Sequence, residues 1–254
     1  MLSVTIIGAG NVATHLYKAL NKAENVSVLQ WYNRNLDAIT SYQNDLVITD
    51  NLNDLKQVDV YIIAVSDDVI GALSSKLPFT EKLVVHTSGS VSLHDLDKKN
   101  IRGVLYPLQT FTKDADIDFT EVPICIEIEN KAYLQTLKNL SEALGCKHYR
   151  VNSDQRAALH LAAVFVNNFT NQLYRIGHEI TESKSVEFDI LKPLIKETAR
   201  KIETLSPYMA QTGPAKRGDK KTIKKHLRTL DKDIHKEIYE LLTKSIKQTH
   251  GKKL

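Results

Sequence analysis

The 254-residue chain has little cysteine and no long apolar run, and both shortages narrow the classes of protein to which it can belong. Its two cysteines, Cys125 and Cys146, have no spacing typical of a metal site, so we expect neither a disulfide framework nor a bound metal, and we expect a reducing cytoplasm. No apolar run approaches the ~20 residues of a membrane span, so no membrane association is expected. The first strand is expected to start at residue 2 or 3, which leaves no room for a targeting segment.

Charge is unevenly distributed along the chain. Residues 213–254 contain 13 Lys and Arg and 5 Asp and Glu, which gives them a net charge of +8. Because the whole chain has a net charge of +4, residues 1–212 have a net charge of −4. A basic C-terminal region fits nucleic acid, an anionic small molecule or a solvated helix face. Its lysines alternate with apolar residues at helical spacing and have few aromatic neighbours, so we expect no nucleic-acid partner.

The N-terminal segment from Val4 to Ala13 combines a short apolar run, two glycines and the start of an amphipathic helix. Gly8 permits a sharp turn, Gly10 leaves room for a pyrophosphate, and Ala13 permits close packing of helix and strand. Backbone N–H groups at the helix start, from Asn11 and Val12 onward, are then free to face the anion. The pattern predicts a dinucleotide-binding turn; the alternative is a tight turn without a ligand.

The second predicted strand, residues 26–32, ends in Asn33 and Arg34. Cofactors with a free ribose 2′-hydroxyl are usually held by an acidic residue at this point, whereas a 2′-phosphate is accommodated by an arginine. The acid is absent, and a guanidinium binds phosphate in a bidentate way. We therefore predict NADP rather than NAD; the alternative is an ordinary exposed arginine in a loop.

Two later strand ends are expected to line the same ligand. The apolar run 58–65 ends in Ala64, Val65 and Ser66, where the ribose lies in this architecture, and the run 82–85 leads to Thr87 and Ser88, near the expected nicotinamide. We assign Ser88 a catalytic role and the other four residues cofactor contacts. The acidic pair that follows Ser66, residues 67–68, is expected only to cap the next helix.

Strand-like and helix-like segments alternate up to residue 152. From residue 153 onward the spacing of apolar residues is typical of helices. The alternation predicts a Rossmann-type, doubly wound, mostly parallel α/β sheet followed by an all-helical domain. We place an NADP-binding domain at 1–152 and a helical domain for substrate binding and dimerisation at 153–254. The latter is expected to begin with a helix running to about residue 183, capped by Ser153 or Asp154, and to contain a loop at 206–218.

One face of that long helix carries uncharged polar groups. At 100° per residue, Asn167 and Asn171 each fall within about 20° of His160, opposite a broad apolar arc. This arrangement fits the wall of a polar cleft in which His160 exchanges a proton with a substrate oxygen, with Asn167 catalytic and Asn171 contacting substrate. It fits a surface or interface histidine with structural asparagines equally well.

A loop near the C-terminal helices, residues 212–219, combines Gly, Pro and two cations. Arg217 is a candidate for binding a substrate carboxylate, whereas Asp219 is expected to cap the next helix. The alternative is a rigid connection between helices.

These motifs together resemble the bacterial Rossmann-like NADP oxidoreductases that carry a C-terminal helical domain of unknown function. That group is similar to pyrroline-5-carboxylate reductase and deazaflavin-dependent NADP oxidoreductase. The resemblance rests on the glycine turn and on four further segments: residues 86–89, 106–111, 160 with 167–169, and 212–219. It implies a homodimer joined through the helical domains, a cofactor in the interdomain cleft and, from some relatives, a small 2-oxo acid substrate.

At two positions this chain differs from related proteins, and the catalytic roles of those positions cannot be carried over to it. Tyr106 stands where many relatives have histidine. Related 3-hydroxy acid dehydrogenases have a catalytic lysine four residues before an asparagine, and this chain has Ala163 or Asn167 at that position.

We predict a reductase that transfers hydride from NADPH to a C=O or C=N group of a small, carboxylate-bearing metabolite. The alternative is a non-catalytic NADP-binding sensor or assembly module.

Overall fold

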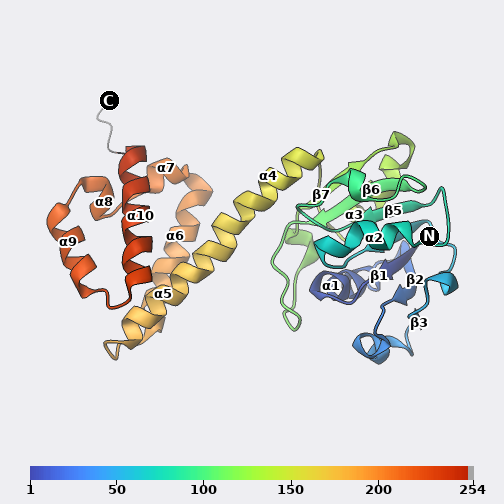
Figure 1. The fold of residues 1–254 in the computed structure, drawn as a ribbon, viewed down its shortest axis with the longest axis horizontal. Coiled ribbons are helices and arrows are strands. Elements are labelled where there is room, and N and C mark those ends of the chain that lie inside the picture. Colours follow the sequence, from blue (N-terminus) through green and yellow to red (C-terminus); the bar gives the residue numbers. More distant parts are fainter. Residues whose placement is uncertain (251–254) are drawn as a thin grey trace. The chain divides into compact units, whose positions relative to one another are not determined.

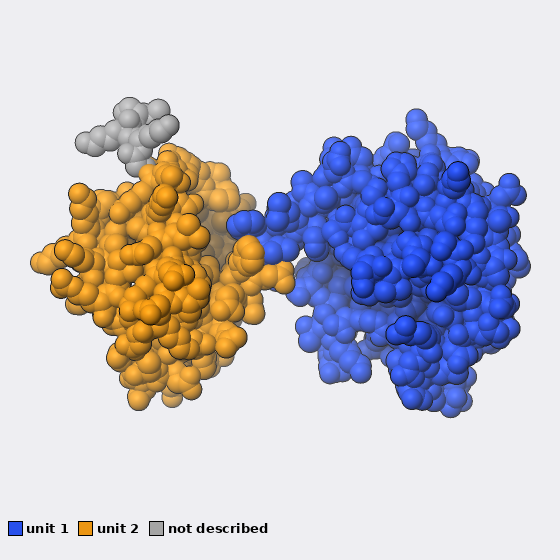
Figure 2. Space-filling model, viewed as in Figure 1, with its two compact units in different colours: residues 1–167 blue, residues 168–254 orange. Residues whose placement is uncertain are grey.

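The computed structural model describes residues 1–250, which form two compact units. The first comprises residues 1–167 and the second, within the described range, residues 168–250 (Figure 2). The predicted domain boundary after residue 152 falls at the start of a helix, 15 residues before the division between the units. That boundary stays a prediction, because the helix begins within the first unit.

The first unit is built on one eight-stranded sheet in the order β3-β2-β1-β4-β5-β6-β7-β8 (Figure 1). All neighbouring strands are parallel except β6 and β7. The strands are β1 (Leu2–Ile7), β2 (Val26–Tyr32), β3 (Val47–Thr49), β4 (Val60–Ile63), β5 (Leu83–His86), β6 (Ile101–Pro107), β7 (Ile124–Ile128) and β8 (His148–Arg150). The predicted mostly parallel sheet is confirmed, and its chain order reverses between β1 and β4, where such sheets bind ligands.

Helices pack on both faces of this sheet. Because successive side chains of a strand point to opposite faces, Ile6 of β1 packs with α1 (Asn11–Leu20) and α3 (Leu134–Ala143), whereas Ile7 packs with α2 (Ile70–Ser75). Leu16 of α1 and Leu137 of α3 are fully buried on the first face. The doubly wound arrangement therefore follows from strands that are apolar on both sides.

Residues 153–250 are helical apart from short connections. The elements are α4 (Ser153–Ala163), a π-helical segment (Val164–Phe169), α5 (Thr170–Glu182), a 3₁₀ turn (Phe188–Leu191), α6 (Lys192–Thr204), α7 (Pro207–Ala210), α8 (Pro214–Arg217), α9 (Lys220–Thr229) and α10 (Asp233–His250). Asp219 caps α9, as predicted: its carboxylate accepts hydrogen bonds from the backbone N–H of Thr222 at 3.0 Å and from its hydroxyl at 2.7 Å.

Several local expectations were wrong. Asn152, not Ser153 or Asp154, caps α4, because its side chain and that of Gln155 form a reciprocal capping box. Two one-turn helices, α7 and α8, occupy the expected loop at 206–218. Two 3₁₀ turns, Leu36–Ala38 and Thr40–Tyr42, follow β2, and β6 includes Tyr106 and Pro107.

Two features are absent from residues 1–250. No helix there is both long and apolar enough to cross a membrane. In the same residues, no group of three or more His, Cys, Asp or Glu is arranged to hold a metal ion.

Candidate dinucleotide and proton-transfer site

The glycine turn connects β1 to α1 and packs against the end of β4. Gly8 has a φ of +114°, and its N–H donates to the Tyr32 carbonyl at 2.9 Å. A Cβ atom at Gly8 would lie 2.3 Å from the Ala64 carbonyl oxygen and 2.7 Å from Val65 Cγ1. Both the backbone conformation and the close approach of β4 therefore require glycine here.

Gly10 forms an open cradle at the start of α1. It has extended dihedral angles (φ −75°, ψ 179°), and a Cβ atom built there meets no heavy atom within 4 Å. Within residues 1–250 no side chain caps this helix, so its first backbone N–H groups have no capping acceptor. The helix dipole favours negative charge at the same end. These features fit a pyrophosphate.

The Asn11 side chain holds a loop that is distant in the sequence. Its side-chain amide donates to the Phe111 carbonyl at 2.8 Å, and His15 Nε2 lies 2.8 Å from the Thr112 carbonyl oxygen. The segment after β6 is thereby tied to α1, beside the glycine turn. Val12 is half-buried and packs against the core, so its backbone N–H is the group left for a ligand.

The end of β2 presents one free cation. Arg34 is exposed, and no residue between 1 and 250 forms a hydrogen bond or ion pair with its guanidinium. The Asn33 side-chain amide donates instead to the Asn35 carbonyl at 2.7 Å, which shapes the turn. Arg34 is therefore available to an incoming anion, whereas the Asn33 amide already has a partner.

The ends of β4 and β5 lie side by side, because Thr87 N–H donates to the Ile63 carbonyl at 3.1 Å. Ser66 is exposed and Thr87 is buried. Asp67 accepts a hydrogen bond from Ser90 Oγ and forms no capping hydrogen bond, so its predicted role as a helix cap was wrong. This contact joins the segments that follow the two strands.

Ser88 organises the turn after β5. Its Oγ accepts hydrogen bonds from the N–H groups of Ser90 at 3.1 Å and Val91 at 3.0 Å, and its own N–H donates to His86 Nδ1 at 3.1 Å. Burial, reinforced by the charge of Arg156, lowers the pKa of His86 to about 4, so this imidazole is neutral near pH 7. The Ser88 hydroxyl oxygen is thus engaged in the turn, and its catalytic role stays a prediction.

His160 of α4 contacts the ends of β5 and β6. Its Nδ1 lies 3.1 Å from the Tyr106 hydroxyl, and the two rings are in edge-to-face contact with centroids 6.0 Å apart. A Cβ atom at Gly89 would lie 2.6 Å from His160 Nδ1 and 2.8 Å from Tyr106 Cζ. Gly89 therefore makes room for this pair.

An ion pair holds α4 in place one turn before His160. Arg156 is fully buried; its guanidinium pairs with Glu127 of β7 and also donates to the Val91 carbonyl. Ser153 Oγ lies 3.0 Å from both carboxylate oxygens of Glu127. Because residues four apart share a helix face, this anchor fixes the face that carries His160.

The predicted helix wheel does not hold beyond α4. Asn167 lies in the π-helical segment, whose wider turn rotates every later side chain by roughly one residue's angle relative to a regular helix. The regular-helix geometry that placed Asn167 and Asn171 on the face of His160 therefore does not apply across this segment. Both asparagines are exposed. Asn171 and the exposed Arg217 belong to the second unit, and the roles of all three stay predictions.

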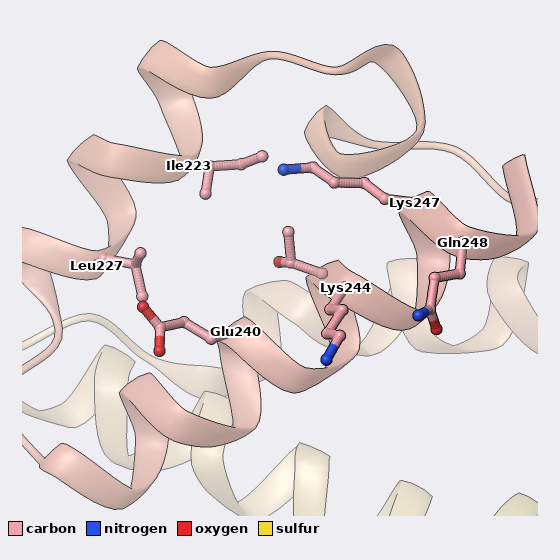
Figure 3. A pocket seen from close by; sticks show the side chains of 7 residues that line it. Ile223, Leu227, Glu240, Lys244, Lys247 and Gln248 are labelled. Atoms are coloured by element: carbon pink, nitrogen blue, oxygen red, sulfur yellow. The ribbon is translucent and has the colours of Figure 1, made fainter. Parts of the chain in front are cut away.

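None of the predicted site residues lines the cavity of about 500 Å³ in the helical unit (Figure 3). Ile223 and Leu227 of α9 face Glu240, Lys244 and residues 247–248 of α10 across it. A second cavity, of about 710 Å³, lies between α1 and residues 114–120. The residues that line these two cavities include neither the glycine turn nor His160.

Sequence reasoning missed Gly89 and Arg156 and gave Tyr106 no role. One available signal was the spacing of Arg156 and His160, which puts an arginine on the same helix face as the candidate histidine. Another was the position of Tyr106 at the end of a strand adjacent to the strand that leads to Ser88. The contact of Tyr106 with His160, 54 residues away, has no local signature.

Comparisons with known proteins agree with this class of fold. Residues 3–89 match the family "NADP oxidoreductase coenzyme F420-dependent", and residues 122–246 match a domain of unknown function, DUF2520. A Bacteroides fragilis protein described as a candidate NADP oxidoreductase is 37% identical, with 97% of this chain and 98% of that chain covered and a TM-score of 0.87. No functionally curated protein matches the chain.

More distant structures share the fold. Pyrroline-5-carboxylate reductase from Streptococcus pyogenes is 13% identical, with 99% of both chains covered and a TM-score of 0.67. A variant imine reductase from Myxococcus stipitatus, solved with NAD⁺, is 17% identical, with 99% of this chain and 96% of that chain covered and a TM-score of 0.64.

The fold and the glycine turn thus define a Rossmann-type oxidoreductase with a helical C-terminal region. Within that class, the chain belongs to the family that joins an F420-type NADP oxidoreductase domain to DUF2520. The resemblance expected from the motifs is thereby confirmed.

Proposed function

We propose that the protein is an NADPH-dependent reductase of a C=O or C=N group in a small, carboxylate-bearing metabolite. The observation that carries this proposal is the open cradle at Gly10, with uncapped N–H groups of α1 beside it, in a chain of an oxidoreductase family. When bound, the cofactor supplies the hydride. The chain supplies the binding groups, the orientation and the proton.

The proton is assigned to His160. Its ring is half-buried, its Nδ1 contacts Tyr106, and no other residue in the range 1–250 forms a hydrogen bond with its Nε2. Nε2 is therefore the atom able to meet a substrate oxygen or nitrogen. Asn167 is proposed to have a catalytic role as well, and Asn171 and Arg217 are proposed to bind the polar groups of the substrate, Arg217 taking the carboxylate.

Arg34 sets the cofactor preference in this proposal. Arg34→Ala is expected to weaken NADPH binding about 10- to 100-fold and to leave NADH binding nearly unchanged, because only NADPH carries a 2′-phosphate and a charge-assisted hydrogen bond contributes about 1.5–3 kcal/mol. Titrations that follow cofactor fluorescence measure both affinities.

Arg150→Ala is the matched control, since Arg150 is also exposed and lies on β8, at the opposite edge of the sheet from β3. It is expected to bind both cofactors as the wild type does. Equal loss of NADPH affinity in both variants would mean that net charge, rather than Arg34, selects the phosphate.

The competing function is a non-catalytic NADP sensor, which needs Gly8, Gly10 and Arg34 but not His160. NADPH oxidation in a screen of 2-oxo acids and cyclic imines separates the two functions. Turnover that His160→Ala lowers supports the reductase. Binding of NADPH with no turnover of either substrate class favours the sensor.

We also propose a homodimer joined through the helical unit. Apolar side chains there are strongly exposed: Ile190 by 68%, Leu194 by 63% and Ile202 by 57%. Exposed apolar surface of this kind marks association sites.

Leu194→Glu is expected to convert the dimer to a monomer in sedimentation analysis. Leu29→Glu is the control, because Leu29 is a leucine of β2 that is 37% exposed, and this variant is expected to stay a dimer. A monomeric wild type would contradict the proposal.

A further inference from the structure

We propose that Tyr106 is a positioning residue whose hydroxyl donates a hydrogen bond to His160 Nδ1 and thereby keeps the proton of the neutral imidazole on Nε2. This inference rests on the proposed proton transfer by His160, for which it sets the orientation and the resting tautomer of the ring. Tyr106 acts through His160 and is not itself assigned a contact with substrate.

The direction of the hydrogen bond follows from what Tyr106 can satisfy. Its side chain is 8% exposed, and its hydroxyl has one partner among residues 1–250, His160 Nδ1 at 3.1 Å. If Nδ1 carried the proton and donated, the buried phenolic proton would have no acceptor, which is costly. Donation from Tyr106 satisfies both groups at once.

The ionisation of Tyr106 agrees with this direction. Burial raises the pKa of its phenol to about 12, so the hydroxyl keeps its proton throughout the physiological range. A neutral imidazole with Nδ1 as acceptor must carry its proton on Nε2. The Nε2–H is then the group that can donate a hydrogen bond to the substrate oxygen or nitrogen. Full transfer of a proton from Nε2 requires the imidazolium, in which Nδ1–H donates to the Tyr106 hydroxyl oxygen and the ring returns to the Nε2–H or Nδ1–H neutral form only after giving up one proton.

Two further contacts hold the pair together. Gly89 leaves just enough space for both rings, because a Cβ there would lie 2.6 Å from His160 Nδ1. The buried pair of Arg156 and Glu127 fixes α4 one turn earlier. The hydrogen bond therefore joins two side chains that are each held by rigid elements.

The test uses ¹⁵N NMR of the histidine side chains in the full-length protein without substrate or cofactor. For wild type near pH 8 we expect His160 as a single Nε2–H tautomer, with an Nδ1 signal typical of a hydrogen-bond acceptor. In Tyr106→Phe, the Nδ1 signal is expected to move toward that of free imidazole, with exchange between tautomers. Gly89→Ala, which displaces His160, should give the same change.

Tyr61→Phe is the matched control. Tyr61 is also buried, and its hydroxyl donates to the Lys56 carbonyl at 2.7 Å, so this variant loses one hydrogen bond on the sheet face that packs with α2. It should leave the His160 signals unchanged. Wild-type Nδ1–H, or identical His160 signals in wild type and Tyr106→Phe, would overturn the assignment.

Kinetics distinguish this inference from the proposed function. With a turned-over substrate, Tyr106→Phe is expected to lower kcat about tenfold and to change KM less than twofold, because the proton donor is misplaced while binding is kept. Undiminished kcat in His160→Ala would overturn the proton role of His160. The NMR result needs no substrate and judges the Tyr106 assignment separately.

Discussion

Gly10→Ala is expected to leave the free energy of unfolding within about 1 kcal/mol of the wild-type value and to weaken NADPH binding at least about tenfold. The backbone at Gly10 is extended, which alanine adopts readily, and the added methyl group meets no atom of the chain within 4 Å. The methyl group occupies the space proposed for the pyrophosphate, so the cost appears only on binding.

Gly8→Ala provides the contrast. Its φ of +114° and the approach of the Ala64 carbonyl oxygen to 2.3 Å from the added Cβ are expected to lower the free energy of unfolding by about 3 kcal/mol. Urea unfolding and cofactor fluorescence, measured on both variants, separate stability from binding. Wild-type NADPH affinity in a folded Gly10→Ala protein would show that the dinucleotide does not bind at this turn.

Glu127→Leu is expected to lower the free energy of unfolding by about 3–5 kcal/mol, because it leaves the fully buried guanidinium of Arg156 without its carboxylate. Arg156→Met should cost less, since the Glu127 side chain is 16% exposed and keeps Ser153 as a partner. The double variant should recover much of the loss, since neither charge is then buried alone.

Urea unfolding of the two single variants and the double variant gives this cycle. Losses that add in the double variant would mean that the two side chains stabilise the protein independently. A smaller loss in Glu127→Leu than in Arg156→Met would contradict the burial argument, because the more buried partner should be the costlier one to leave unpaired.

Local patterns predicted the parts of the fold that depend on neighbouring residues. The glycine turn after β1, the apolar run of β4 and the cap at Asp219 each express a preference within a few residues. The alternation of such runs was enough to predict a doubly wound sheet followed by helices. Element ends were less predictable, as Asn152 at the start of α4 illustrates.

The pairing of distant residues could not be predicted in the same way. Tyr106 meets His160 and Glu127 meets Arg156 because of how strands and helices pack in space, and nothing within a few residues records it. The π-helical segment was equally unpredictable, since its polar and apolar residues fit a regular helix equally well. The candidate site was thus predictable at its strand ends and unpredictable where α4 joins them.

A fluorescence titration of the wild-type chain with NADPH tests most directly whether the glycine turn holds a nicotinamide dinucleotide. We expect saturable binding of one NADPH per chain, tighter than the binding of NADH and weakened at least about tenfold by Gly10→Ala. Unchanged fluorescence with both cofactors up to millimolar concentration would contradict the proposed site, and the reductase function would fall with it.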